Sequence, residues 1–306
     1  MRPRSPSAVA VGRRDRPFPA ANLCRATLRA VPRRFAQVDV FTTQPYAGNP
    51  VAVVLDGAGL SVDAMQRFAH WTNLSETTFV LPPESRDADY RVRLFTPGRE
   101  LPFAGHPTLG TCHAWLETGG APRREDVIVQ ECGTGLVPVR RTEAGLAFAA
   151  PPLMRSGPVD DALVERLARM LGVDRAAMRD TQWVDNGPGW VAVLLDDPEA
   201  VLALTPRFDE LDVGVAAPYP AGSSEAFEVR AFTYKNGAVD EDPVTGSLNA
   251  SLAQWLLATG RATAPYVARQ GTALGRAGRV HVSQDADGAV WVGGGTVSCV
   301  RGELDL

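Results

Sequence analysis

Three side chains that can exchange protons stand beside turn or helix signals: Glu76 in NLSETTFV, His106 in LPFAGHPTLGT and Asp242 in DEDPVTGSLNA. Two carboxylates and an imidazole can move a proton between atoms of a bound molecule when a fold brings them together. An isolated glutamate at a strand end is more often a solvated carboxylate, and an aspartate before proline is often only a helix cap. The elements that position these residues therefore decide the interpretation.

The two proline-containing segments follow one pattern that occurs twice. Residues 92–116 align with residues 229–256, which places His106 on Asp242 and Gly110 on Gly246. Each copy predicts a strand, a loop and a helix with proline at its first position, where the missing N–H costs nothing. Asp242 is then a predicted N-cap, and His106 a weaker one. We expect the ordered chain to be two copies of one α/β unit.

Each predicted helix carries a glycine in its opening turns, Gly110 or Gly246, at a cost of about 1 kcal/mol relative to alanine. Either another backbone or a ligand must approach closely there. If the two helix N-termini face each other across a pseudo-twofold interface, their N–H groups and positive dipole ends favour a carboxylate or an enolate-like intermediate. This arrangement favours acid–base chemistry on a small anionic substrate.

The chain is predicted to divide into a tail and two lobes. Residues 1–33 are rich in arginine and have no periodic apolar face, so they are predicted to be disordered. The N-terminal lobe is predicted over residues 34–150. The C-terminal lobe, a repeat of the first, is predicted over residues 151–306, and the boundary between the lobes falls in a Pro-rich linker at 150–158.

Composition restricts the class of function. The 306 residues are 45% apolar, yet no apolar run reaches the eighteen or so residues of a membrane span. Residues 35–306 carry 22 basic and 34 acidic side chains, and an acidic body argues against nucleic-acid binding. Four cysteines without a CxxC pair are typical of a reducing cytoplasm. We expect a cytoplasmic protein with no membrane or nucleic-acid partner.

Neither a metal nor an organic cofactor is expected. His106 and His113 are seven residues apart, about 10 Å along a helix, which is too far to ligate one metal. The only lysine, Lys235, lies in a turn-like segment that does not suit a pyridoxal-phosphate Schiff base.

Several motifs together resemble the PhzF-like family, the phenazine-biosynthesis isomerase group. They are FAQVDVFTTQPYAGNPVAVVL, NLSETTFV, LPFAGHPTLGT, DEDPVTGSLNASLAQWL, RQGTALGRAGRVHV and VWVGGGTVSCVRGEL. The resemblance spans residues 34–304 in the right order. It implies an α+β, diaminopimelate epimerase-like fold: two pseudo-symmetric lobes, each a β-sheet wrapped around a central helix, with the site between them. It also implies a homodimer with one site per chain.

The same resemblance implies a cofactor-independent isomerase in which Glu76 moves a proton, assisted by His106 and Asp242. The substrate would be a small carboxylated metabolite, cyclic or unsaturated. The residues expected to bind it lie at the two helix starts: Gly105, Thr245, Gly246 and Ser247.

Sister branches of this fold, the amino-acid epimerases and proline racemases, use one cysteine at each central helix start. His106 and Asp242 at these positions exclude two-thiol racemisation. The segment ECGTGL resembles the epimerases' second cysteine motif, but no Pro-led helix follows Cys132, which we expect to be structural. Two alternatives stay open: a non-catalytic small-molecule-binding protein of the same fold, and a lyase or epimerase that uses Glu76.

Overall fold

A computed structural model describes residues 32–207, 209–235 and 238–306. The predicted tail lies outside them except for Pro32 and Arg33, which open strand β1 (Pro32–Val40). The Arg33 guanidinium donates to the backbone oxygens of Asp56 and Ala58 in the loop after the second strand. Strand β1 therefore begins two residues before residue 34, where the N-terminal lobe was predicted to begin. Among the described residues, no helix is both long and apolar enough to cross a bilayer.

The first half of the chain contains ten elements. They are β1, β2 (Asn49–Val54), α1 (Val62–Thr72), β3 (Glu76–Leu81), β4 (Tyr90–Phe95), β5 (Glu100–Leu101), α2 (Gly105–Glu117), β6 (Val127–Cys132), β7 (Gly135–Thr142) and β8 (Gly145–Ala149). Helix α1 covers one face of the sheet, and its N-cap is Ser61, whose hydroxyl accepts from the Ala64 N–H.

The second half repeats this order with three further elements, β9 and α3 before the repeat and β18 after it. Its elements are β9 (Arg155–Pro158), α3 (Asp161–Leu171), β10 (Asp180–Asp185), β11 (Val191–Leu194), α4 (Pro198–Leu202), β12 (Val213–Pro218), β13 (Phe227–Lys235), β14 (Ala238–Asp242), α5 (Gly246–Ala258), β15 (Tyr266–Gln270), β16 (Gly278–Gln284), β17 (Val290–Gly294) and β18 (Thr296–Asp305). Two short 3-10 turns, Arg175–Ala177 and Thr272–Leu274, complete it.

The repeat is visible in the strand pairings. In the first half, β2 and β3 are parallel, β4 is antiparallel to β3 and β5, and β6 joins β4 in parallel. In the second half, β11, β12, β13, β14 and β15 pair in the same sequence and the same directions. Strands β8 and β17 join the two halves. All the strands therefore belong to one continuous sheet.

The last strand belongs with the first half. Strand β18 pairs with β1 from Pro32–Asp305 to Val40–Thr296, whereas β9 occupies the equivalent place beside β10. The lobe boundary predicted at residues 150 and 151 stays a prediction, but residues 296–305 are hydrogen-bonded to the lobe in which the chain begins.

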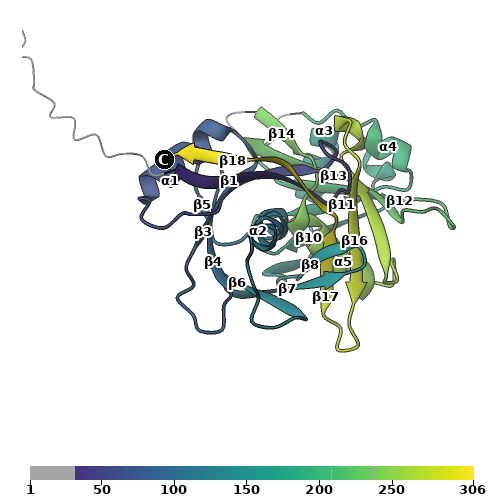
Figure 1. Cartoon of the computed structure of the whole chain (residues 1–306). Coiled ribbons are helices and arrows are strands. Elements are labelled where there is room, and N and C mark those ends of the chain that lie inside the picture. Colours follow the sequence, from purple (N-terminus) through teal and green to yellow (C-terminus); the bar gives the residue numbers. More distant parts are fainter. Residues whose placement is uncertain (1–31, 208, 236–237) are drawn as a thin grey trace, which may run out of the picture. The chain divides into compact units, whose positions relative to one another are not determined.

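Each half wraps around one buried helix. Figure 1 looks along α2, around which β1, β3, β4, β6 and β8 curve. Residues 105–112 of α2 are all buried, and α5 packs against β10, β16 and β17. A helix surrounded by sheet must be apolar on nearly every face, as the sequences of α2 and α5 are.

The alignment of the two helices predicted from sequence is wrong by several residues. Helices α2 and α5 both have 13 residues, and counting from their first residues pairs Gly105 with Gly246 and His106 with Ser247. Pro107 is the third residue of α2, whereas Pro243 precedes α5. The reason is that β14 is longer than β5 and continues to Asp242, whereas the connection from strand to helix has three residues in both copies, 102–104 and 243–245.

Candidate active site

The N-termini of the two central helices meet at a pair of glycines. A Cβ atom on Gly246 would lie 2.9 Å from the His106 backbone nitrogen and 3.1 Å from Gly105 Cα. A Cβ atom on Gly105 would lie 3.2 Å from the Gly246 carbonyl carbon and 2.6 Å from Phe148 Cζ. Only glycine permits this approach. Two positive dipole ends, with N–H groups that find no partner inside their own helices, are thereby brought to one place.

The close neighbour expected at Gly246 is therefore another backbone. At Gly110, in contrast, an added Cβ would lie 2.3 Å from Val51 Cγ1 and 3.0 Å from Val40 Cγ2. Strand side chains fill that space, so this glycine serves the packing of α2 on β1 and β2. Protein atoms alone therefore explain why Gly110 and Gly246 have no side chain, and no bound ligand is required.

Glu76 and His106 lie side by side at this junction. Glu76 is the first residue of β3, His106 is the second residue of α2, and Glu76 Oε2 is 3.4 Å from His106 Nε2. Their side chains are 15% and 4% exposed, respectively. A nearly buried carboxylate beside an imidazole can take a proton from a bound substrate and return it. The structure brings these two predicted residues together, and their catalytic roles stay a prediction.

Asp242 reaches the same junction, but it is not the predicted helix cap. It is the last residue of β14, and the N-cap of α5 is Thr245, which makes no side-chain cap bond. The Asp242 carboxylate instead accepts from Thr245 Oγ1 at 2.7 Å, from Asn49 Nδ2 at 2.9 Å and from Ser75 Oγ at 3.4 Å. These bonds fix a carboxylate that is 9% exposed within a polar network.

Asn49 was missed by the sequence analysis. Its fully buried amide nitrogen donates to Asp242 Oδ1 and to the Val244 carbonyl oxygen, both at 2.9 Å, and lies 3.3 Å from His106 Nδ1. Strands β2 and β3 run parallel and begin at the same edge, which places Asn49 near Glu76. Asn49 lies in the motif FAQVDVFTTQPYAGNPVAVVL, but the local signal there, Asn-Pro, is typical of a turn.

Gln270, the last residue of β15, was also missed, although it lies in the motif RQGTALGRAGRVHV. Its amide donates to the Asp242 backbone oxygen and to Thr245 Oγ1, both at 3.0 Å. Its side-chain oxygen accepts from the Thr245 N–H at 3.0 Å and from Asn249 Nδ2 at 2.7 Å. Thr245 was expected to bind substrate, but its hydroxyl proton is given to Asp242, so its visible role is to hold that carboxylate.

Ser247 is the second residue of α5, in the position that His106 occupies in α2. Its hydroxyl accepts from the indole N–H of Trp190 at 3.0 Å, and its backbone oxygen accepts from Asn186 Nδ2 at 2.9 Å. The predicted residues Gly105, His106, Gly246 and Ser247 thus share the place where the two helices begin.

The three cysteines among the described residues lie in the protein interior or on β18, and none of them begins a central helix. Cys132 ends β6 and is buried, with its sulfur 3.2 Å from Thr134 Oγ1. Cys112 is fully buried in α2, and burial raises the pKa of its thiol to about 12. Cys112, Cys132 and Cys299 are all free thiols. In the described part of the chain, no three His, Cys, Asp or Glu side chains gather closely enough to hold a metal ion.

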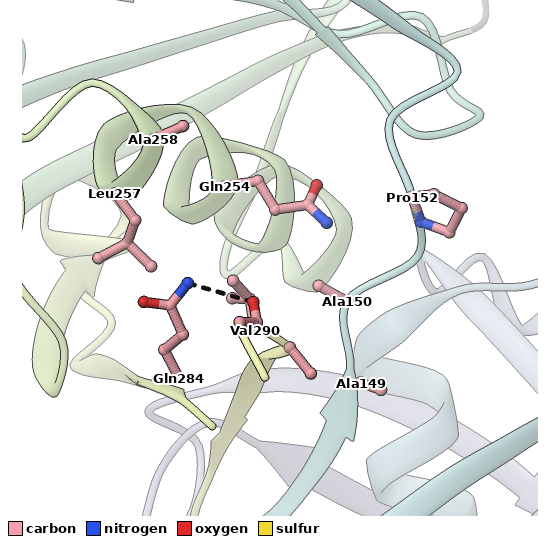
Figure 2. Close-up of a pocket in the computed structure, with 10 residues that line it drawn as sticks. Ala149, Ala150, Pro152, Gln254, Leu257, Ala258, Gln284 and Val290 are labelled. Atoms are coloured by element: carbon pink, nitrogen blue, oxygen red, sulfur yellow. Dashed lines mark hydrogen bonds between the residues drawn. The ribbon is translucent and has the colours of Figure 1, made fainter. Parts of the chain in front are cut away.

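A surface pocket of about 440 Å³ lies at the opposite end of α5 (Figure 2). It is lined by Gln254, Leu257 and Ala258 of that helix, with Gln284 and Val290 from β16 and β17. Its lining contains no titratable side chain, so it does not suit proton transfer.

Comparison with known proteins identifies the family. The profile of the phenazine biosynthesis-like proteins, PhzC-PhzF, matches residues 38–302. Antisense-enhancing sequence 1 of Schizosaccharomyces pombe is 34% identical over 291 residues, covering 88% of this chain and 97% of that protein. Trans-2,3-dihydro-3-hydroxyanthranilate isomerase of Pseudomonas aeruginosa is 34% identical over 289 residues, covering 89% of this chain and 99% of the enzyme.

Solved structures agree on the fold. A PhzF-family protein from Bacillus anthracis superposes with a TM-score of 0.76 at 24% identity, covering 90% of this chain and 100% of that one. A hydroxyproline epimerase from Agrobacterium vitis superposes with a TM-score of 0.56 at 14% identity, covering 90% and 93%. The predicted epimerase-like fold and the predicted enzyme class, an isomerase, are confirmed. The chain belongs to the phenazine biosynthesis-like, PhzC-PhzF, family.

Proposed function

We propose that this protein is a cofactor-independent isomerase in which Glu76 removes a proton from one carbon of a small carboxylated metabolite and returns it to another. The observation that carries the proposal is the 3.4 Å approach of Glu76 Oε2 to His106 Nε2 where two helix N-termini meet. The substrate is a cyclic or unsaturated carboxylate, because a conjugated acid can delocalise the charge that proton removal creates.

The electrostatics of the junction favour an anion. Two positive helix ends held in backbone contact at Gly105 and Gly246 repel each other, and negative charge in addition to the Glu76 and Asp242 carboxylates relieves this repulsion. A substrate carboxylate supplies that charge in the ground state, and an enolate-like intermediate supplies more of it during the reaction. The helix ends therefore stabilise the charge that Glu76 creates.

His106 and Asp242 have separate roles in this proposal. The His106 imidazole is within reach of Glu76 and can hydrogen-bond to its carboxylate or to the substrate. Asp242 is held by Asn49 and Thr245 with its carboxylate at the same junction. The Glu76 side chain is 15% exposed, so exchange of the transferred proton with water competes with its direct return to the substrate.

The test replaces Glu76 by glutamine and compares it with a matched variant. Trans-2,3-dihydro-3-hydroxyanthranilate, the substrate named for relatives, is the first compound to assay. Glu76→Gln keeps the size of the side chain but cannot shuttle a proton, so kcat should fall at least about a hundredfold with KM nearly unchanged. Glu84→Gln makes the same chemical change on a side chain that is 70% exposed and should leave kcat unchanged.

Solvent isotope incorporation gives an independent readout. In deuterated water the product should carry solvent deuterium at the accepting carbon, diluted by any original proton that Glu76 retains. Wild-type turnover by Glu76→Gln would overturn the role of Glu76. Failure of the wild-type protein to isomerise any of a panel of cyclic unsaturated carboxylates would overturn the isomerase proposal.

The proposal includes a homodimer with one site per chain and a cytoplasmic setting. The family resemblance supports the dimer. Three free thiols in the described chain support the cytoplasmic setting, because free thiols are typical of a reducing compartment. Analytical ultracentrifugation at micromolar concentration should show a dimer, and a monomer alone would contradict it.

A further inference from the structure

The loop between β10 and β11 holds the first turn of α5 at two atoms of Ser247. The Trp190 indole N–H donates to Ser247 Oγ at 3.0 Å, and Asn186 Nδ2 donates to the Ser247 backbone oxygen at 2.9 Å. Neither contact was foreseen, because DNGPGW carries only the signal of a turn.

This loop is built to be rigid. One carboxylate oxygen of Asp185 accepts from the N–H groups of Gly187 and Gly189, both at 2.7 Å, and both glycines have positive φ angles, 138° and 101°. The Trp190 backbone oxygen accepts from the Val184 N–H, and its side chain is 2% exposed within the main hydrophobic core. The indole N–H is therefore a fixed donor.

The chemistry of the pair sets the direction of the serine hydroxyl. An indole N–H donates only, whereas a hydroxyl has one proton and two acceptor lone pairs. Ser247 Oγ must act as the acceptor in its bond with Trp190, and that bond leaves the hydroxyl proton unused. A hydroxyl fixed in this way is prepared to donate to an acceptor of its own.

The position of Ser247 identifies that acceptor. Ser247 follows Gly246, whose backbone lies against Gly105 and His106 at the meeting point of the two positive helix ends. An anionic oxygen is the acceptor that such a place favours, and hydrogen bonds to charged groups are stronger than those to neutral ones. A neutral amide, which carries donors as well as one acceptor, gains less there.

We propose that Trp190 is a positioning residue that fixes the Ser247 hydroxyl as a donor to the carboxylate of the substrate, and so sets the preference for a carboxylate over an amide. The proposal rests on the isomerase function proposed above for the same site. Trp190 does not touch the substrate in this scheme, and its effect passes through Ser247.

The experiment measures binding, so it does not depend on turnover. The probes are anthranilate, a stable aromatic carboxylate related to the substrate named for relatives, and its amide, 2-aminobenzamide. The wild-type protein should bind anthranilate more tightly than the amide by isothermal titration calorimetry. Trp190→Phe and Ser247→Ala should each weaken anthranilate binding about tenfold and change amide binding far less.

A double-mutant cycle separates positioning from packing. In the Ser247→Ala background, Trp190→Phe should add no further loss of anthranilate affinity, because the hydroxyl it acts through is absent. Additive losses would overturn the proposal, as would equal binding of the two probes or no binding of anthranilate by the wild-type protein. Thermal unfolding of each variant reports packing damage separately.

An isosteric replacement keeps the test decisive if Trp190→Phe does not fold. Incorporation of benzothienylalanine at position 190 retains the bicyclic ring but replaces its N–H by sulfur. It should reproduce the loss of carboxylate preference, and wild-type preference in that protein would overturn the proposal. If the cycle succeeds but no substrate is isomerised, the anion site stands and the proposed function alone fails.

Discussion

The amide of Asn49 donates to the carboxylate of Asp242 over 2.9 Å, although the two residues are 193 positions apart in the chain. The orientation of this amide is fixed by its surroundings. Exchange of its nitrogen and oxygen would place a carbonyl oxygen against the Asp242 carboxylate and the Val244 carbonyl, where neither can donate. A neutral side chain from β2 therefore connects the acidic residue of the second half to His106 of the first.

Asn49→Asp should damage the site more than its small size change suggests. The new carboxylate oxygen would face Asp242 Oδ1 and the Val244 oxygen, so a favourable bond becomes a repulsion between like charges. We expect kcat to fall at least about a hundredfold and the free energy of unfolding to fall by about 1–3 kcal/mol, because the donor of a buried bond is lost. Steady-state kinetics and urea unfolding measure the two effects.

The matched control is Asn73→Asp, the same change three residues before Glu76. Asn73 is exposed and adopts a left-handed conformation with φ of 54°, which aspartate also tolerates. It should keep wild-type kcat and stability. Equal effects of the two substitutions would show that added negative charge alone, and not the Asn49 contacts, explains the loss.

Local signals predicted the elements better than their joint arrangement. The helix that begins after Ser61 follows directly from its cap and its apolar spacing, because both are properties of neighbouring residues. The pairing of β18 with β1 joins the two ends of the described chain. No residue pattern in either strand identifies the strand with which it pairs. Long-range pairing depends on the whole fold, so it was not foreseen.

The start of α5 shows why the helix start and its N-cap were predicted incorrectly. Pro243 suits the first position of a helix, but β14 extends to Asp242 because its backbone pairs with β13. Tertiary pairing overrode the local preference and moved the helix start to Gly246. Asn49 and Gln270 were missed because their roles arise only from contacts with residues distant in the chain.

Gly246→Ala should displace the two helix ends. A Cβ atom would lie 2.9 Å from the His106 backbone nitrogen, and backbone cannot move as a side chain can. We expect a loss of about 1–3 kcal/mol in the free energy of unfolding, the usual cost of overpacking, together with a clear loss of activity. Gly98→Ala is the control, because no atom lies within 4 Å of a Cβ added there and its φ is not positive. Wild-type kinetics in Gly246→Ala would contradict the close approach.

Activity should survive removal of the thiols. Burial raises the pKa of Cys112 to about 12, so this group is a neutral thiol at physiological pH and a poor base or nucleophile. A folded protein with Cys112, Cys132 and Cys299 all changed to serine should retain turnover within about twofold of wild type, since Glu76 carries the proton. Loss of turnover with an unchanged far-ultraviolet circular dichroism spectrum would show that a thiol takes part in the chemistry.

Two glutamates at one end of β13 should respond to pH in opposite directions. Glu228 is fully buried, accepts from the Tyr219 hydroxyl at 2.6 Å and lies 3.7 Å from Arg269 Nε. Its burial raises its pKa. The hydrogen bond from Ser224 lowers the pKa of Glu225, and Arg279, at 2.6 Å, acts in the same direction.

The sign of each effect follows from linkage between protonation and folding. A raised pKa in the folded state means that Glu228 contributes most below its unfolded pKa of about 4.3 and that this contribution is lost as pH rises through the folded value. A lowered pKa means that Glu225 stabilises the fold above about 4.3 and that this is lost as pH falls through its folded value. Across a pH range that extends on both sides of about 4.3, the melting temperature of Glu228→Gln relative to wild type should rise as pH increases above that value, whereas that of Glu225→Gln relative to wild type should rise as pH decreases below it. Because both variants make the same chemical change within one cluster, differential scanning fluorimetry across this pH range compares them directly. A shift of both melting temperatures in the same direction with pH would contradict the opposite pKa shifts.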